Sequence, residues 1–269
     1  SVERVLKRYA QKDPRVRYVI LGGNRGISGN TNAALEMAAG DFVLLADHDD
    51  TLPEHAFYEV VKALNEHRGC DVLYSDEDKL DMDGKALFDP HFKPDFNPDL
   101  LTSVNYICHL FVVKKSILDQ VGGFRQEFDG AQDYDFIFRC TEKAKEIVHI
   151  PKVLYHWRCH QNSTASNPES KLYAFEAGSR AIMAHYERMG IQAEGVEKGV
   201  DYGIYHTRFK IKGEPLVSVI IPNKDHSRDL DTCVRSILER SSYRNLEFII
   251  VENNSTQQET FDYYRKMEE

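Results

Sequence analysis

The sequence lacks any long apolar run. The longest candidates, Phe42 to Ala46 and Val217 to Ile221, have only the length of a β-strand, whereas a membrane-spanning helix needs about 20 apolar residues. No charged segment followed by an apolar one opens the chain in the manner of a secretory leader. The sequence therefore predicts no transmembrane segment, and peripheral contact with the inner face of a membrane stays open as a further option.

Paired cysteines and a phosphate loop are also missing. The cysteines are odd in number, and none forms a CxxC pair: they are Cys70, Cys108, Cys140, Cys159 and Cys233. This pattern argues against a disulfide framework and predicts a reducing, cytoplasmic location. No GxxxxGK[ST] pattern occurs, which excludes a phosphate-loop NTPase.

Positive charge is in short supply. The 34 Lys and Arg residues face 43 Asp and Glu residues, so the formal net charge is −9. This balance argues against nucleic acid as a partner, because a phosphate backbone needs clustered basic side chains. A nucleotide ligand needs only a local site, and part of the acidic excess is available to hold a divalent cation.

What is present is an ordinary globular composition of 269 residues, with 42% hydrophobic and 29% charged residues, enough for one large or two small domains. Strands and helices are expected to alternate at the start. The predicted helices are Val2–Tyr9, Asn30–Ala39 and Pro53–Leu64, and the predicted strands are Tyr18–Leu21, Phe42–Ala46 and Val72–Ser75. This alternation predicts the α/β class, with a Rossmann-type, mixed and mainly parallel sheet flanked by helices.

A polar, proline-containing loop is expected from Asp76 to Asn105, with a short strand near Ala86 to Phe88. Further strands are predicted at Ile107–Val113, Val153–Arg158 and Gly203–Lys210, and helices at Lys115–Val121, Asp133–Lys145 and Pro168–Met189. After Gly213 a new series begins, with strands Val217–Ile221 and Leu246–Val251 and helices Leu230–Arg240 and Glu259–Met267. We therefore predict two domains, residues 1–212 and 213–269.

The acidic cluster at residues 47–50 directly follows a predicted buried strand. Hard cations such as Mg²⁺ and Mn²⁺ prefer oxygen ligands and often bridge a carboxylate to substrate phosphates. Ligands of such sheets bind beyond the carboxyl ends of the strands, where Asp47 and Asp49 stand. The alternative is a solvated acidic turn that caps the helix beginning at Pro53.

The context of this cluster is specific. A Gly- and Asn-rich turn leads into a helix, then come Gly40-Asp41, the apolar strand and the acidic cluster. In order, spacing and chemistry this stretch resembles the inverting family-two glycosyltransferases of GT-A fold, which use nucleotide-sugar donors. The resemblance implies a Mg²⁺ or Mn²⁺ ion held by Asp49 with Asp47, and Asp47 near the donor ribose. It also implies donor contacts from the turn and helix residues Asn24, Gly29 and Asn32.

A second segment, Gly130 to Asp135, resembles the "ED.D" pattern that the same family carries at the start of a helix beneath its acceptor site. The resemblance implies that Asp133 is the base that takes the proton of the acceptor hydroxyl. Gln132 stands where the family has the first acid. The alternative role of Asp133 is to cap the helix, and Asp135 is expected to support the helix start or contact the acceptor.

The stretch from His156 to His160, followed by Ser163-Thr164-Ala165, resembles a third segment of the family. It implies that His156 completes the metal or diphosphate contacts and that Arg158 neutralises the leaving group. Trp157, the only tryptophan, either stacks on a sugar or fills the core. Asp76 is expected near the donor sugar, with a charged surface loop as the alternative.

The tail resembles the opening of the same family over Val217 to Asp225 and Phe248 to Ser255. By this resemblance Pro222 and Asn223 line a nucleoside pocket and Glu252 or Asn253 faces the base, where the family more often has Asp. The first unit lacks such an opening. We therefore expect a piece of a tandem two-transferase polypeptide, in which the tail completes the first sheet within the chain or in a swapped homodimer.

The predicted function is transfer of a sugar from a nucleotide-diphospho-sugar to a saccharide acceptor with inversion, in bacterial surface polysaccharide synthesis. One alternative is a noncatalytic nucleotide- or carbohydrate-binding module, which Gln132 and Glu252 favour. A nucleotidyltransferase is a third possibility, although the basic, Gly-rich phosphate loop expected of that class is not seen.

Overall fold

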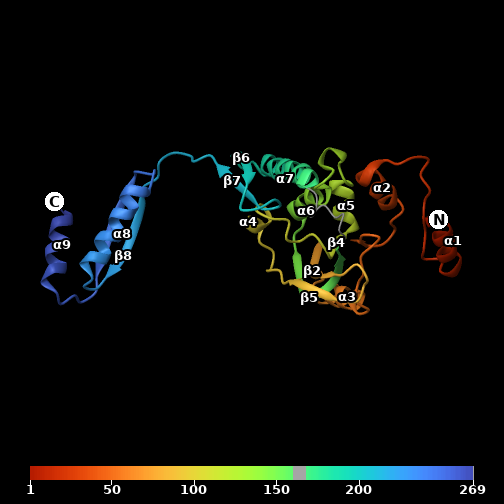
Figure 1. The fold of residues 1–269 in the computed structure, drawn as a ribbon, viewed down its shortest axis with the longest axis horizontal. Helices are drawn as coiled ribbons and strands as arrows, with labels where there is room; N and C mark the ends of the chain where they lie inside the picture. Colours follow the sequence, from red (N-terminus) through yellow and green to blue (C-terminus); the bar gives the residue numbers. More distant parts are fainter. Residues whose placement is uncertain (160–167, 269) are drawn as a thin grey trace. The chain divides into compact units, whose positions relative to one another are not determined.

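The computed structural model describes residues 1–159 and 168–268. They form two compact units, Ser1–Lys210 and Ile211–Glu269, which are considered separately (Figure 1). The division lies close to the predicted boundary. Among the described residues, no helix combines the length and the apolar character that crossing a bilayer requires.

The first unit is an α/β structure, as predicted. Its helices are α1 (Val2–Lys12), α2 (Gly26–Leu35), α3 (Ala56–Glu66), α4 (Pro98–Leu101), α5 (Lys115–Val121), α6 (Gln132–Lys143) and α7 (Pro168–Met189), with a 3₁₀ turn, η1, at Gln126–Phe128. Its strands are β1 (Phe42–Leu45), β2 (Val72–Leu80), β3 (Leu87–His91), β4 (Phe111–Lys114), β5 (Ile147–Arg158), β6 (Ala193–Lys198) and β7 (Tyr205–Phe209).

The long strand β2 organises a mixed sheet. Along one edge it pairs antiparallel with β4 and then with β3, while β5 runs parallel to its whole length. Strand β1 pairs antiparallel with β4, so β1 and β2 run in the same direction with β4 between them. Helix α3 makes the crossover that such a pair of parallel strands requires. The prediction of a mixed sheet with flanking helices is confirmed.

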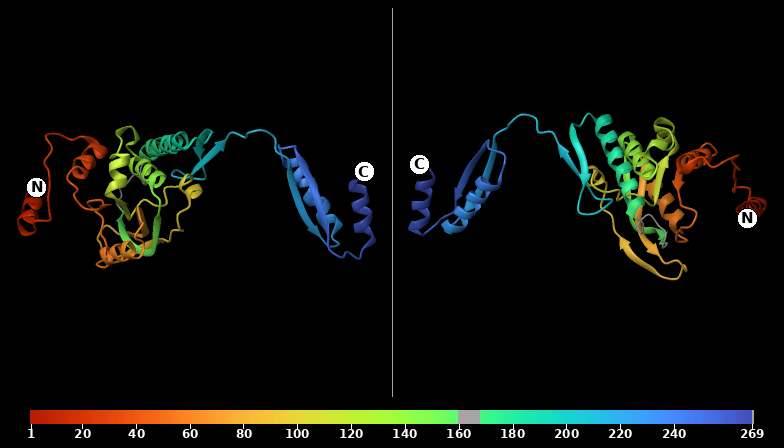
Figure 2. Two further views of the ribbon diagram at one scale, coloured as in Figure 1. Left: turned by 180° about the vertical axis from the view of Figure 1, so that it is seen from behind. Right: turned by 45° about the horizontal axis from the view of Figure 1, so that its top comes forward.

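Alternate residues of the central strands face opposite sides of this sheet, as strand geometry dictates. Val72, Tyr74 and Phe111 belong to the core cluster that includes residues of α5, α6 and α7. Leu73 and Val112 belong to the cluster that includes residues of α3. One helical layer therefore covers each face, and the hairpin of β2 and β3 extends beyond the helices (Figure 2).

Strand β2 continues through a charged stretch that the sequence predicted to be a loop. Asp76, Glu77 and Asp78 are all buried, which a period-two pattern of apolar residues does not anticipate. Each carboxylate has a partner: His149 for Asp76, Lys93 for Glu77 and His156 for Asp78. Burial of a charge is tolerated when it is paired and hydrogen-bonded, and only the fold brings these partners together.

The predicted strand Tyr18–Leu21 is wrong. The segment is extended, yet within the described residues it pairs with no strand, and Val19 and Ile20 are 48% and 60% exposed. A short apolar run becomes a buried strand only where a neighbouring strand takes up its backbone groups. Helix α1, which precedes it, has no buried residue.

A β-hairpin of β6 and β7 packs beside α7. Tyr205 at the start of β7 is buried and stacks on Phe175 of α7, with 5.1 Å between ring centroids. Its ring lies against Gly178, where an added Cβ would come within 1.9 Å of the Tyr205 hydroxyl oxygen. The edge strand expected at residues 203–210 is thus present, and β6 is its unpredicted partner.

Replacing Gly178 by alanine is expected to destabilise the first unit by about 1–3 kcal/mol, the usual effect of overpacking a core. This exceeds the gain of up to about 1 kcal/mol from the higher helix propensity of alanine. A urea denaturation midpoint measures the change. The control is Gly195→Ala in β6, where an added Cβ meets no atom within 4 Å. Equal midpoints for the two variants would contradict the expectation.

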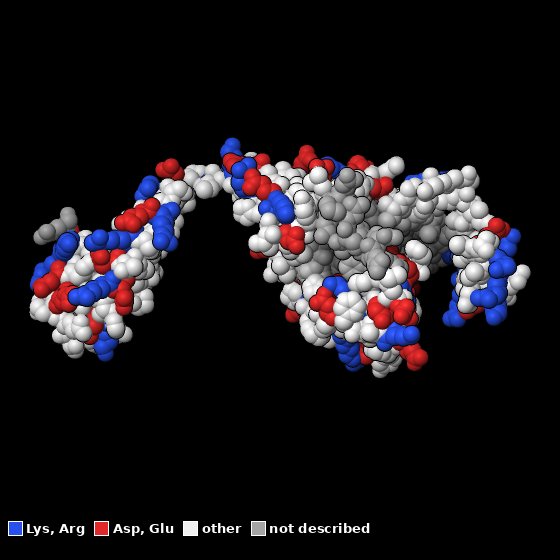
Figure 3. Space-filling view, viewed as in Figure 1, with Lys and Arg blue, Asp and Glu red and all other residues white. Residues whose placement is uncertain are grey.

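The second unit consists of β8 (Val217–Asn223), α8 (Ser227–Arg240), β9 (Leu246–Glu252) and α9 (Gln258–Glu268). Its two strands pair in parallel from Val217 opposite Leu246 to Asn223 opposite Glu252. The β-α-β-α order matches the prediction. Basic and acidic side chains alternate on the face of this unit that Figure 3 shows, so that face carries no field of one sign.

Candidate active site

A cavity of about 630 Å³ lies at the carboxyl end of β1, within the size range of small-molecule sites. Its wall combines the end of β1, the loop before β4, the first turn of α6, the end of β5, and the α7 and β7 region. The lining residues that carry the argument are Asp47, Asn105, Cys108, His109, Asp133, Tyr134, Trp157, Phe175, Asp201, Tyr202 and Tyr205. Asp47 and Asp133, far apart in the sequence, thus share one cavity.

The acidic loop after β1 is held by the end of β5. The Tyr155 hydroxyl accepts a hydrogen bond from the Asp47 N–H at 3.0 Å and donates one to the Asp50 carboxylate. The Arg158 N–H donates to the same carboxylate at 2.8 Å, and its guanidinium donates to the Asp49 carbonyl at 2.7 Å. Asp50 and Arg158 therefore fix the course of the loop that presents Asp47 to the cavity.

Three side chains in this region offer ligand atoms to one cation. Oxygen atoms of Asp47 and Asp50 and a ring nitrogen of His109 all lie within 4.8 Å of one another. The His109 ring stacks on Tyr155, with 4.5 Å between centroids, and its Nδ1 is buried without a hydrogen-bond partner. Two carboxylates and an imidazole suit Mn²⁺, and with added water ligands also Mg²⁺.

The charge of this group favours a cation. Partial removal from water raises the pKa of the Asp47 carboxylate; His109 opposes this rise, and the nearby carboxylates, Asp50 first among them, add to it. A bound divalent cation would relieve the repulsion between the carboxylates. The sequence had predicted Asp47, Asp49 and His156 as ligands. Asp47 belongs to the group in the structure, while His109 was missed because no motif surrounds it.

Asp133 projects from the first turn of α6. Its Oδ2 accepts a hydrogen bond from the Asn105 amide at 2.9 Å and lies 3.7 Å from the Cys108 sulfur. Burial raises the pKa of the Cys108 thiol well above its usual range, so the thiol stays protonated and donates to the carboxylate. The N-cap of α6 is Ala131, not Asp133, so the helix-capping alternative is wrong.

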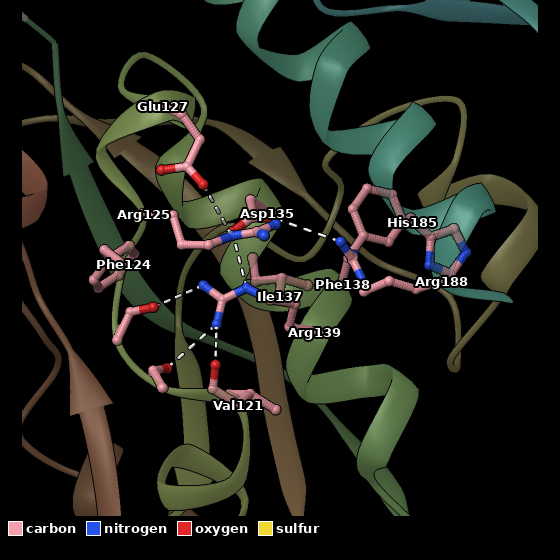
Figure 4. A network of polar contacts seen from close by, with 12 residues as sticks. Val121, Phe124, Arg125, Glu127, Asp135, Ile137, Phe138, Arg139, His185 and Arg188 are labelled. Carbon is pink, nitrogen blue, oxygen red and sulfur yellow. Dashed lines mark hydrogen bonds and ion pairs between the residues drawn. The ribbon is translucent and has the colours of Figure 1, made fainter.

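Two residues further along α6, Asp135 serves the structure. It is fully buried, and its carboxylate accepts from Arg139 at 2.9 Å and from Arg125 at 3.0 Å (Figure 4). The Arg139 guanidinium also donates to the backbone carbonyls of Val121 and Gly123 at 2.7 and 2.8 Å. This network fastens α6 to the segment after α5 and leaves Asp135 no exposed surface for a ligand.

The predicted donor residues around α2 have local roles in the structure. The side-chain oxygen Oδ1 of Asn24 accepts hydrogen bonds from the Gly26 N–H and the Asn30 side-chain amide at 3.0 and 3.1 Å, which shapes the turn into the helix. Asn32 exchanges two hydrogen bonds with the Phe124 backbone, at 2.7 and 2.9 Å. An added Cβ at Gly29 would come within 2.7 Å of the Arg25 Cβ. None of Asn24, Gly29 and Asn32 lines the cavity.

Of the other predicted residues of the first unit, Trp157 lines the cavity, whereas Asp76 and His156 do not. Asp76 is buried, with 2.8 Å between its carboxylate and the His149 ring nitrogen, and it accepts from the Lys93 N–H at 2.9 Å. His156 pairs with Asp78. Trp157 lines the cavity and is 39% exposed, so it does not simply fill the core. His160 and Ser163 to Ala165 lie outside the described residues.

The four predicted residues of the tail gather at the carboxyl ends of β8 and β9. The Asn223 amide donates to the Tyr264 hydroxyl at 2.8 Å, and Tyr264 donates to Glu252 at 2.7 Å. The Asn253 N–H donates to the Asn223 carbonyl at 2.9 Å, and Pro222 directly precedes Asn223 on β8. Hydrogen bonds from Ser255 hold the pKa of Glu252 below its usual range.

Comparison with known proteins gives a match to one family model and to several relatives. Residues 1–122 match the model described as Glycosyl transferase family 2. The chain is 42% identical over 270 residues to the uncharacterized protein y4gI of Sinorhizobium fredii, covering 100% of this chain and 30% of that protein. It is 39% identical over 258 residues to the O-antigen biosynthesis protein RfbC of Myxococcus xanthus, covering 96% of this chain and 20% of that protein.

The chain therefore spans about a third or less of the length of these relatives. Chondroitin synthase of Pasteurella multocida is 25% identical over 161 residues, which is 60% of this chain and 16% of that protein. Among solved structures, Staphylococcus aureus TarS aligns with a TM-score of 0.48 at 19% identity, over 68% of this chain and 58% of that one.

Proposed function

Because residues 1–122 match the model of glycosyl transferase family 2, we propose that this chain is part of an enzyme of that family, which transfers a sugar from a nucleotide-diphospho-sugar to a saccharide acceptor, with inversion at the anomeric carbon. The observation that carries the proposal is that Asp47, with its cation-binding neighbours, and Asp133 line one cavity. A relative named for O-antigen biosynthesis supports a setting in surface polysaccharide assembly.

In the proposed reaction Asp133 acts as the general base. Its carboxylate takes the proton of an acceptor hydroxyl while that oxygen forms a bond to the anomeric carbon of the donor. The bond from that carbon to the diphosphate oxygen breaks on the opposite side, so the electron pair leaves with the nucleoside diphosphate. Attack and departure on opposite sides of the carbon invert its configuration.

Asp47, Asp50 and His109 are the residues of this chain that would hold a Mn²⁺ or Mg²⁺ ion. Their donor set of two carboxylates and one imidazole fits the ion, and the His109 Nε2 lies 3.7 Å from an Asp47 carboxylate oxygen. When bound, such an ion supplies positive charge that neutralises a diphosphate. Asp49 stays a proposed ligand by family resemblance. The Arg158 guanidinium holds the loop by donating a hydrogen bond to the Asp49 backbone carbonyl.

We further propose that the tail is the opening of a second family-two unit. Its parallel β-α-β order supports this, as does the gathering of Pro222, Asn223, Glu252 and Asn253 at the carboxyl end of its strands. A swapped homodimer, in which this tail pairs with the free edge of β1 in a second copy, is testable by light scattering. A monomer at all concentrations would refute the swap and leave the transferase proposal standing.

Calorimetric titration tests the proposed donor site. UDP, GDP and dTDP are titrated in turn into the protein with Mn²⁺ and again with EDTA. We expect one nucleotide to bind only with Mn²⁺, and Asp47→Asn to abolish that binding because a ligand oxygen is lost. The control is Asp83→Asn, which removes an exposed carboxylate from the β2–β3 turn. Nucleotide binding that is equally strong with EDTA and with Mn²⁺ would contradict metal dependence. Nucleotide binding without sugar transfer would favour a noncatalytic binding module.

Replacing Asn105 by alanine is expected to lower kcat about tenfold while the donor KM changes little. The amide donates to Asp133 Oδ2 at 2.9 Å, and losing a hydrogen bond to a charged group costs about 1.5–3 kcal/mol. Steady-state kinetics with separate kcat and KM measure the effect. Asn105→Asp is the contrasting variant, because it removes the donor and adds like charge. A higher donor KM with unchanged kcat would contradict a role in holding Asp133.

A further inference from the structure

Two aromatic side chains in the cavity keep much of their surface exposed. Trp157 at the end of β5 and Tyr202 before β7 are each 39% exposed. Aromatic rings bury large apolar areas when they find a partner. The Lys198 ammonium lies 3.8 Å from the Tyr202 ring centroid. Apolar ring surface is therefore available to a ligand inside the same cavity that holds Asp133.

A packed layer supports this surface. Phe175 meets Tyr202 edge-on, with 6.0 Å between centroids, and stacks on Tyr205. Tyr205 and Tyr134 are buried and lie 5.9 Å apart, and Tyr134 directly follows Asp133 in α6. A chain of packed aromatic rings thus connects Tyr202 to Tyr134, the neighbour of Asp133 in α6.

The charged side chains that line the cavity are carboxylates, and the Lys198 ammonium beside Tyr202 is not among the lining residues. Asp47, Asp133 and Asp201 contribute carboxylates, and none of the lining residues that the structure describes is Lys or Arg. His109 is the one imidazole among them, and it lies 3.7 Å from Asp47. Like charges a few ångströms apart repel strongly where water is partly excluded, so an anionic ligand group is disfavoured beside Asp133 and Asp201.

From these observations we infer that the cavity is a subsite for an uncharged hexopyranose, the terminal sugar of the acceptor, stacked by its C–H face on Trp157 and Tyr202. The inference rests on the proposed transferase function and specifies its acceptor class. Hydroxyl groups at the ring edge find acceptors and donors in Asp133, Asp201 and Gln132, which also line the cavity. The carboxylates of Asp133 and Asp201 disfavour uronic acids and phosphorylated sugars there, whereas a bound cation would neutralise the charge of Asp47.

The single tryptophan makes the test direct, because Trp157 is the only source of indole fluorescence in the chain. The protein is titrated with methyl β-D-glucopyranoside and with methyl β-D-glucopyranosiduronic acid. The two probes share ring and stereochemistry and differ in the carboxylate at C6. We expect a saturable change in emission with the neutral probe and at least tenfold weaker binding of the anionic one.

Two variants separate stacking from charge. Tyr202→Ala is expected to lower the affinity for the neutral probe at least fivefold, because one of the two stacking rings is lost. Asp201→Asn removes one repelling charge, and we expect it to reduce the ratio of neutral-probe to anionic-probe affinity at least threefold. In the control, Asp83→Asn, this ratio is expected to stay unchanged. Equal affinity of the probes for the unaltered protein, or no saturable change with the neutral one, would overturn the inference.

The outcomes also distinguish this inference from the proposed function. Nucleotide binding with Mn²⁺ is measured on Tyr202→Ala and is expected to match the unaltered protein. If the protein prefers the neutral sugar but transfers no sugar, the subsite inference stands and the proposed transferase function is refuted. Transfer to an anionic acceptor at the same rate as to its neutral counterpart would retain the transferase and refute the subsite.

Discussion

Replacing Asp133 by asparagine is expected to lower kcat by about 10²–10⁴-fold, the usual contribution of a general base. Asparagine has nearly the same size as aspartate, and its side-chain oxygen can still accept the hydrogen bond from the Asn105 side-chain amide. It cannot take a proton from the acceptor hydroxyl. Donor binding is expected to stay within a few-fold of the unaltered protein, because the proposed cation ligands are Asp47, Asp50 and His109. Initial rates with the nucleotide-sugar chosen by calorimetry measure the loss.

The control for Asp133→Asn is Asp119→Asn on α5. Asp119 is an exposed carboxylate that pairs with Lys115 one helical turn away, so its loss changes charge without touching the cavity. Its kcat is expected to equal that of the unaltered protein. An Asp133→Asn variant that retains kcat within a few-fold would remove Asp133 as the base and direct attention to another carboxylate of the cavity.

Replacing Asp135 by asparagine is expected to lower the free energy of unfolding of the first unit by about 3–5 kcal/mol, the range for breaking a buried ion pair. The Arg139 side chain is only 7% exposed, so its charge would stay buried without a carboxylate. This amounts to a large part of the 5–15 kcal/mol that holds a typical domain together. Guanidinium chloride denaturation followed by circular dichroism measures it.

Asp119→Asn again provides the comparison, since an exposed ion pair contributes about 0–1 kcal/mol. The two helix positions should separate cleanly: Asp133→Asn loses kcat and keeps its unfolding midpoint, whereas Asp135→Asn loses stability. An Asp135→Asn midpoint equal to that of Asp119→Asn would mean that the network of Figure 4 contributes little to folding.

The sequence by itself determined the α/β class, helices α3 and α5 to α9 to within a few residues, and the acidic cluster after β1, whereas the short helix α4 lies in a stretch predicted to be a loop. These features rest on local patterns: apolar periodicity, glycine and proline at element ends, and a short acidic run after an apolar strand. The family also came from contiguous motifs around Asp47 and Asp133. Such signals survive without knowledge of the fold because the residues that carry them are neighbours along the chain.

Only the tertiary structure decided the partners of these residues. His109, Asn105 and Tyr202 carry no motif, and they reach the cavity because the loop before β4 and the β6–β7 hairpin fold against the ends of β1 and β5. The charged half of β2 became a buried strand because His149, Lys93 and His156 meet its carboxylates across the sheet. The apolar run Tyr18–Leu21 is not a strand because, among the described residues, no neighbouring strand pairs with it. Pairing across long sequence separations sets the energies of buried charge and of strand edges, and a linear pattern does not contain it.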